Sequence, residues 1–191
     1  MKNRSAPIYM DSYHDKLIIK SYESFLPKVK SWIDNLLYCY SSQAKRVVDL
    51  SFPRLPQYFS KDILEMAKVV YIDLPPQIPL SSMGLTQFQD FEKMKIDGVT
   101  YYDTFFVRLP LSSIEYLHFH ELVHVVQWRY LGSDRFLLLY GLELMKNKYS
   151  NSLLEMMAYQ LQTRFQNTTN PFNVELVVKS GLEQEVSRLF D

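Results

Sequence analysis

Residues 113–132 read SIEYLHFHELVHVVQWRYLG, and this stretch predicts a long buried helix at the centre of the fold. Its apolar residues occupy most of the helical circumference, which is typical of a helix enclosed by the rest of the protein. Ser112 followed three residues later by Glu115 has the form of a capping box and predicts that the helix begins near Ser113. Gly132, directly after the last apolar residue, predicts its end.

The middle of this helix carries His120, Glu121 and His124, the HExxH pattern of zinc hydrolases. Residues four apart lie on one face of a helix, so the two imidazoles can direct their nitrogens at one point. A buried pair of histidines beside a glutamate requires a partner such as a metal. The alternative is a core helix whose histidines bond to backbone carbonyls, but that interpretation leaves Glu121 unexplained.

The expected chemistry follows from this geometry. A catalytic zinc ion takes three protein ligands and keeps its fourth position for water. Glu121 lies about 100° around the helix from His120, close enough to contact that water without binding the metal. Zinc lowers the pKa of the water towards about 7 and polarises a carbonyl, while Glu121 takes the proton and delivers it to the leaving group. His118 lies roughly 200° around the helix from His120 and is not expected as a ligand.

Two downstream glutamates compete for the position of third ligand. Glu155 opens a second apolar helix that runs to about Phe165, and Ala158 one turn later allows this helix to pack closely under the first. Glu143 is followed by Lys146 and Lys148, which indicate a solvated surface with salt bridges. The sequence favours Glu155 and keeps Glu143 as the alternative.

Glu155 also has a purely structural interpretation, because Ser152 and Glu155 form a second potential capping box. With that interpretation Glu155 binds no metal, and a site in which neither glutamate is a ligand is the remaining alternative.

The order His120-Glu121-x-x-His124, then Glu155-x-x-Ala158 some thirty residues later, resembles the gluzincin group of zinc metallopeptidases. The resemblance covers roughly residues 68–166. It implies zinc bound by His120, His124 and Glu155, hydrolysis of peptide bonds, and a small sheet packed on an active-site helix and a glutamate helix. Many gluzincins have an acidic residue after the alanine that orients a ligating histidine, whereas Tyr159 stands at that position here.

Two strands are predicted before the active-site helix. Residues 98–109 are dense in β-branched and aromatic residues and are bounded by Asp97-Gly98 and Pro110, and residues 68–73 form a similar run. In gluzincin-like folds a strand such as 98–109 forms the sheet edge above the metal and binds the substrate by strand addition. An ordinary half-buried strand is the alternative.

The remaining segments predict helices. Apolar residues recur at helical spacing from Leu17 to Leu37, with Pro27 as a break or helix start, and a further helix is expected over 61–67. A last amphipathic helix is expected from Ser180 to Phe190. The N-terminal helices are expected to complete the core, and an inhibitory cap over the cleft is the alternative.

The prediction is therefore an α+β, mostly helical fold in which residues 1–191 form one zincin-like domain. It divides into a helical extension (1–60), a catalytic core (68–166) and a C-terminal segment (171–191). The length and the 47% hydrophobic content are sufficient for one sizeable core.

Composition limits the partners and the compartment. A formal net charge of zero argues against nucleic acid as the main partner, and no window reaches the length of a membrane span. The single cysteine, Cys39, cannot form an internal disulfide and is expected as a buried apolar residue. Together with the lack of a signal-like apolar run, it predicts the cytoplasm.

We therefore expect a zinc-dependent hydrolase acting on a peptide or protein substrate, with Tyr140, Tyr149 and Tyr159 as candidates for stabilising the oxyanion. A non-catalytic protein in which zinc only joins two helices is the rival interpretation. Hydrolysis of a non-peptide amide is a second alternative. The sequence does not define cleavage specificity or oligomeric state.

Overall fold

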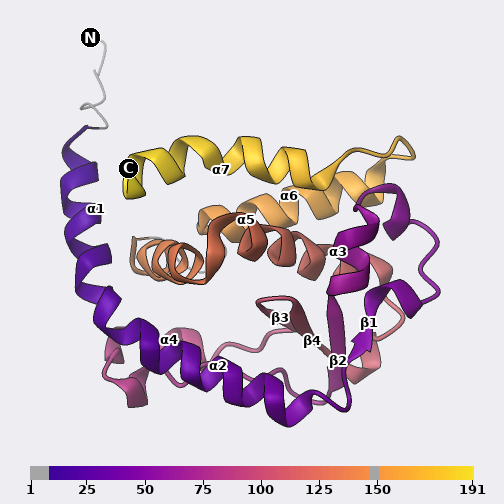
Figure 1. Ribbon diagram of the computed structural model, residues 1–191, viewed down its shortest axis with the longest axis horizontal. Coiled ribbons are helices and arrows are strands. Elements are labelled where there is room, and N and C mark those ends of the chain that lie inside the picture. The colour runs from indigo at the N-terminus through magenta and orange to yellow at the C-terminus, as the bar shows by residue number, and fades with distance from the viewer. Residues whose placement is uncertain (1–8, 147–150) are drawn as a thin grey trace.

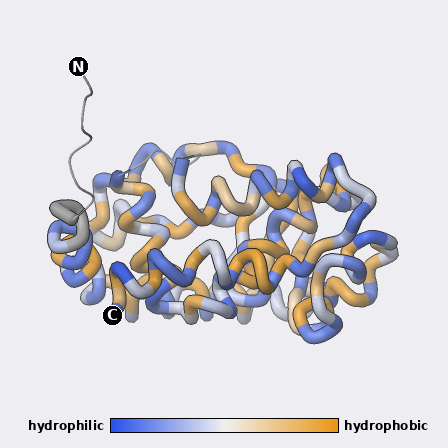
Figure 2. Tube along the Cα trace, turned by 90° about the horizontal axis from the view of Figure 1, so that it is seen from above, coloured by the Kyte–Doolittle hydropathy of each residue, from blue (hydrophilic) through white to orange (hydrophobic). Residues whose placement is uncertain are grey.

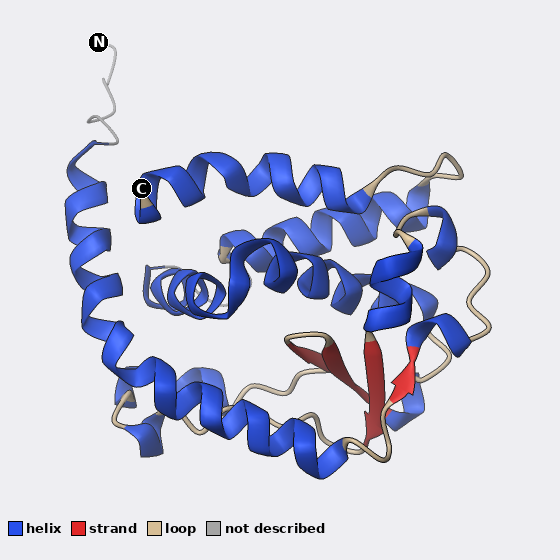
Figure 3. Cartoon of the chain, in the orientation of Figure 1, coloured by secondary structure: helices blue, strands red, loops and turns tan. Residues whose placement is uncertain are grey.

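A computed structural model describes residues 9–146 and 151–191 and shows a mostly helical α+β fold (Figures 1 and 3), as the sequence predicted. The helices are α1 (Tyr9–Tyr22), α2 (Leu26–Tyr40), α3 (Lys61–Met66), α4 (Gln89–Glu92), α5 (Glu115–Lys146), α6 (Leu153–Asn167) and α7 (Val174–Phe190). Hydrophobic and hydrophilic residues are interspersed along the trace (Figure 2), as expected where helices turn one face to the core. None of the described helices has the length and hydropathy needed to cross a membrane.

The four strands form one small mixed sheet in the order β1-β2-β4-β3. They are β1 (Lys45–Arg46), β2 (Lys68–Ile72), β3 (Gly98–Tyr101) and β4 (Thr104–Arg108). β2 pairs in parallel with β4, whereas β1 with β2 and β3 with β4 pair antiparallel. β3 therefore lies at one edge of the sheet, and β4 in its interior carries three fully buried side chains, Phe105, Phe106 and Val107.

The prediction of a strand at 68–73 is confirmed by β2, but the prediction of one continuous strand over 98–109 was wrong. That segment is the β3–β4 hairpin, which turns at Tyr102 and Asp103. Tyr102 adopts a φ of 56°, a left-handed conformation that is uncommon for tyrosine and that the sequence therefore does not indicate. The turn is held by the Asp103 carbonyl, which accepts a hydrogen bond from Lys68 N at 2.8 Å.

α5 is broken by Gly132, whose φ of 73° and ψ of 164° are non-helical. The predicted helix end at this glycine is thus a break, after which the chain continues as a second helical segment to Lys146. The predicted capping box at the start was wrong, because the Glu115 carboxylate accepts hydrogen bonds from Arg54 N at 2.8 Å and Leu55 N at 3.3 Å instead. Glu115 therefore connects the start of α5 to a distant loop.

Side-chain caps define the starts of α3, α6 and α7. Ser60, Ser152 and Asn173 accept hydrogen bonds from the backbone N–H groups of Ile63, Glu155 and Leu176. The cap at Asn173 makes α7 begin at Val174, so the prediction that the last helix begins near Ser180 was wrong.

The N-terminal helices contribute to the core. Ile19 of α1 and Val29 and Ile33 of α2 are buried within the same hydrophobic cluster as residues from the sheet and from α5 to α7. Cys39 near the end of α2 is exposed, contrary to the expectation that it is buried. Within the described chain, α1 and α2 therefore complete the core.

One buried charge joins α1 to the other end of the chain. Asp15 is fully buried and accepts hydrogen bonds from Lys146 Nζ at 2.9 Å and from Arg188 Nη1 at 2.8 Å. Burial alone would raise the pKa of Asp15, but Arg188 and Lys146 hold it below its ordinary value. This carboxylate therefore links α1, the end of α5 and α7.

Candidate metal centre

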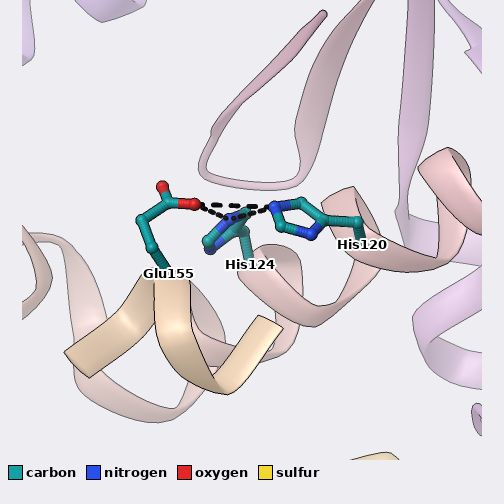
Figure 4. A group of neighbouring side chains, drawn as sticks. All are labelled: His120, His124 and Glu155. Carbon is teal, nitrogen blue, oxygen red and sulfur yellow. Dashed lines mark hydrogen bonds and ion pairs between the residues drawn. The ribbon is translucent and has the colours of Figure 1, made fainter. Parts of the chain in front are cut away.

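Three predicted site residues converge between α5 and α6. His120 and His124 lie one turn apart on α5, and Glu155 faces them from the first turn of α6 (Figure 4). The Nε2 atoms of the two histidines are 3.2 Å apart, and each lies 3.6 Å from Glu155 Oε2. Ligands about 2.0–2.2 Å from a tetrahedral ion are themselves about 3.3–3.6 Å apart. The three atoms therefore have the spacing of a metal-binding group.

The chemical environment of these atoms also fits a cation. The three side chains are 2–6% exposed, and Glu155 Oε2 is buried without a hydrogen-bond partner among the described residues. A buried carboxylate oxygen normally has a hydrogen-bond or metal partner. Two imidazoles and one carboxylate are also a donor set of catalytic zinc sites. The residues present can thus hold a metal ion.

The charges of the three side chains also favour a bound cation. Burial would lower the pKa of His124, but the negative charge of Glu155 outweighs it and raises that pKa to about 9. Burial would likewise raise the pKa of Glu155, but His124 and His120 hold it well below its ordinary value. Without metal, the group therefore holds a proton on His124 beside an ionised Glu155, and a bound cation would replace that proton.

Gln127 orients His124 and joins the two helices. Its Oε1 lies 2.8 Å from His124 Nδ1, and its Nε2 donates to the Leu154 carbonyl at 3.0 Å. Because the Gln127 oxygen accepts, Nδ1 of His124 carries the hydrogen and Nε2 keeps its lone pair for the metal position. Leu154 directly precedes Glu155, so this one amide positions two of the three ligands.

The second histidine lacks an equivalent support. His120 Nδ1 is buried without a hydrogen-bond partner among the described residues. The ring of Tyr159, the residue that replaces the acidic group expected from the gluzincin pattern, packs with its centroid 4.6 Å from the His120 ring. His120 is therefore held by packing rather than by a carboxylate.

Glu121 lies beside the group, against the edge strand. It is 3% exposed, and its Oε2 accepts a hydrogen bond from Thr100 Oγ1 at 2.7 Å. A Cβ on Gly98 would lie 2.3 Å from Glu121 Oε1, so any larger residue at this point of β3 would force the Glu121 side chain to move. Burial raises the pKa of Glu121, although the charges of His120 and His124 oppose this effect.

The tyrosine candidates have different positions. Tyr140 donates a hydrogen bond from its hydroxyl to Glu155 Oε1 at 3.1 Å, which makes it a support for a ligand. Tyr159 is 44% exposed, and burial together with the negative charge of Glu155 raises its pKa. Tyr149 lies outside the described residues.

The structure does not bring the other predicted candidates into the group. Glu143 is 8% exposed, and its Oε2 accepts from Leu153 N at 3.2 Å at the start of α6, so the prediction that it lies on a solvated surface was wrong. His118 pairs with the Tyr71 hydroxyl and the Ile114 carbonyl, both at 2.9 Å. Burial lowers its pKa, as expected for a structural histidine.

Sequence reasoning did not identify Thr100 and Gln127 as supporting residues, and it named Tyr140 only as a candidate for stabilising the oxyanion, not as a support for Glu155. Gln127 had a signal, because it lies three residues after His124 and therefore on the same helical face. Thr100 and Tyr140 act across elements distant in sequence, and their residue types are common in this chain.

No protein-family model, curated protein or solved structure matches this chain. The similarity to the gluzincins therefore depends on the spacing of the His120, His124 and Glu155 motif, and the functional argument depends on the geometry of the group that these residues form.

Proposed function

We propose that this protein is a zinc-dependent hydrolase acting on peptide bonds, with zinc held by His120, His124 and Glu155. The observation that carries the proposal is the position of Glu121, which shares a cavity wall with His124 and Glu155 and is not itself part of the metal-binding group. A metal site that only stabilises the fold does not require a buried carboxylate beside its ligands, and burying that carboxylate is unfavourable.

The roles of the residues follow from their contacts. The bound ion would polarise the carbonyl of the substrate and acidify a water molecule. Glu121, whose pKa is raised by burial, would accept the proton of the attacking water and transfer it to the leaving nitrogen. Thr100 holds Glu121 Oε2 in place, and Gln127 and Tyr140 hold two of the ligands.

The edge strand supports a peptide as the substrate. β3 is the last strand of the sheet, and its residues Gly98, Val99 and Thr100 line the same cavity as Glu121. An edge strand offers backbone groups to an extended chain. On β3 the Thr100 carbonyl already accepts a hydrogen bond from Trp128 Nε1 at 3.2 Å, so a peptide would add to β3 at Gly98, next to the base.

Metal analysis of protein purified without added metal is the first test. We expect near-stoichiometric zinc in the wild type and its loss in Glu155→Gln. Glu143→Gln is the matched control, because the amide oxygen still accepts from Leu153 N and Glu143 lies outside the metal-binding group. Iron in place of zinc, or equal zinc in both variants, would contradict the proposal.

Cleavage assays on a denatured protein then test the chemistry. Glu121→Gln should retain zinc and lose about 100-fold or more in rate, the typical contribution of a general base. Cleavage of small amides but not of peptides in the same screen would favour the non-peptide alternative.

The structural-zinc alternative requires that the metal holds α5 and α6 together. Phe119 and Phe165 already stack between these helices with ring centroids 4.3 Å apart, and both are at most 1% exposed. We therefore expect the helical circular dichroism to persist after chelation. Unfolding on removal of zinc would support a structural role.

A further inference from the structure

The two histidines are equivalent on the side that faces the metal position. Each Nε2 atom lies 3.6 Å from Glu155 Oε2, as the dashed lines in Figure 4 show. His120 is 5% exposed and His124 is 6% exposed, so their contact with solvent is also the same. A difference in how firmly the two histidines hold a metal must therefore come from the other ring nitrogen, Nδ1.

The surroundings of Nδ1 differ between the two histidines. His124 Nδ1 lies 2.8 Å from Gln127 Oε1, and the other end of the same amide is fixed on the Leu154 carbonyl. His120 Nδ1 is also buried, but it has no hydrogen-bond partner among the described residues. His124 thus has an acceptor behind it, whereas the described part of the chain provides none for His120.

Tyr159 of α6 is the residue that packs on the His120 ring. The two ring centroids are 4.6 Å apart and the ring planes are inclined by 56°. The tyrosine hydroxyl does not bond to His120 Nδ1, so the contact between the two residues is made by the rings alone. Such a contact restricts the rotation of the imidazole but supplies no oxygen to accept its hydrogen.

The missing acceptor lowers the affinity of the site for a metal. A neutral imidazole that binds a metal through Nε2 carries its hydrogen on Nδ1. At His124 the Gln127 oxygen accepts this hydrogen, whereas at His120 it belongs to a buried donor without an acceptor, which is unfavourable. Hydrogen-bond partners of this kind typically contribute about 10- to 100-fold to metal affinity.

We propose that Tyr159 makes His120 the weaker of the two histidine ligands and thereby makes the zinc exchangeable. Tyr159 is a positioning residue, which keeps the His120 ring in place and leaves its Nδ1 without an acceptor. The zinc content of the protein then responds to the supply of zinc more strongly than it does in a site with two supported histidines. The inference concerns the regulation of the proposed hydrolase and rests on that function, because it requires that these residues hold zinc.

Chelator competition and stopped-flow release of zinc to excess EDTA test the inference. Tyr159→Gln offers His120 an amide oxygen of the kind that Gln127 offers His124, and we expect about 10- to 100-fold tighter binding with correspondingly slower release. Tyr159→Phe keeps the ring and should bind zinc as the wild type does. Met156→Gln is the matched control and should also leave binding unchanged, because Met156 lies on the same helix and is 43% exposed, compared with 44% for Tyr159.

Nuclear magnetic resonance of the imidazole N–H groups gives a readout that a purely structural role of Tyr159 would not change. Hydrogen bonding moves such protons downfield. In the zinc-loaded wild type, the Nδ1 proton of His124 should therefore resonate further downfield than that of His120. Tyr159→Gln should move the His120 proton downfield and leave the His124 proton in place.

The outcomes distinguish this inference from the proposed function. Tyr159→Glu offers a carboxylate to the same nitrogen and serves as a second variant. If both Tyr159→Gln and Tyr159→Glu bind zinc only as tightly as the wild type, the inference is overturned while the zinc site remains. Weaker binding by Tyr159→Phe would also overturn it, because the hydroxyl would then support His120. If neither the wild type nor Tyr159→Gln binds added zinc, the proposed function fails together with the inference.

Discussion

Replacing Gln127 with leucine should weaken zinc binding and destabilise the fold at the same time. In the folded protein Gln127 is fully buried, accepts from His124 Nδ1 at 2.8 Å and donates to the Leu154 carbonyl at 3.0 Å. A leucine has a similar size but makes neither hydrogen bond. His124 then loses the contact that selects its tautomer, and the Leu154 carbonyl loses its side-chain donor.

The expected magnitudes follow from these two bonds. Loss of a hydrogen bond that orients a ligand typically lowers metal affinity 10- to 100-fold, or about 1.4–2.7 kcal/mol. Leaving two buried polar groups without these partners costs about 1–3 kcal/mol each, so the metal-free variant should lose about 2–6 kcal/mol in free energy of unfolding. Chelator competition measures the first quantity and urea unfolding of the metal-free protein measures the second.

Gln127→Glu separates the two contributions. Its carboxylate still accepts from His124 Nδ1 but cannot donate to the Leu154 carbonyl. We expect zinc affinity within about threefold of the wild type, together with a loss of about 1–3 kcal/mol in stability. The reasoning would be refuted if Gln127→Leu bound zinc as tightly as the wild type, because His124 would then need no orienting partner.

Three further predictions concern backbone space and charge. Gly98→Ala should lower the rate of cleavage roughly 100-fold with zinc content unchanged, because the alanine Cβ would lie 2.3 Å from Glu121 Oε1 and force this side chain to move. An unchanged rate would show that Glu121 does not act as the base. Gly132→Ala should cost about 1–3 kcal/mol in urea unfolding, because φ 73° with ψ 164° is a region that only glycine adopts readily. Because the pKa of Asp15 is lowered in the folded state, its charge stabilises the fold above the unfolded pKa, and this contribution is lost as pH falls through the lower folded pKa. Asp15→Asn should therefore be less stable than the wild type at pH 7, and urea unfolding at decreasing pH should show the difference shrinking below about pH 4; a difference independent of pH would contradict the charge assignment.

The sequence predicted the metal group because its signals are local. His120, Glu121 and His124 lie within two helical turns, and Ala158 marks the close approach of α6, where it is fully buried. Glu155 could be chosen over Glu143 only by this indirect argument. The lysines after Glu143 indicated a solvated surface, but the start of α6 folds back over the carboxylate, and no local pattern shows that contact.

The errors in the fold have a similar cause. The hairpin turn at Tyr102 contains no glycine or asparagine, the residues that usually indicate such a turn, so the sequence of β3 and β4 is typical of one continuous strand. Glu115 has the right spacing from Ser112 for a local cap, yet it accepts hydrogen bonds from Arg54 and Leu55. In each case a long-range hydrogen bond or an uncommon backbone angle overrides the pattern that neighbouring residues suggest.

The arrangement of the ligands also bears on the choice between the proposed catalytic metal and a purely structural one. The stacking of Phe119 on Phe165 and the Gln127 amide already hold α6 against α5. The fold thus brings Glu155 to the histidines and buries a carboxylate and two imidazoles next to one another. Taking such groups out of water has a desolvation cost. Two helices already joined by apolar contacts gain little stability from such a group. The proposed reaction, in contrast, requires a cation held in a fixed position beside Glu121, and this group could hold it. The proposed hydrolase function would therefore account for the buried ligands better than a structural role for the metal.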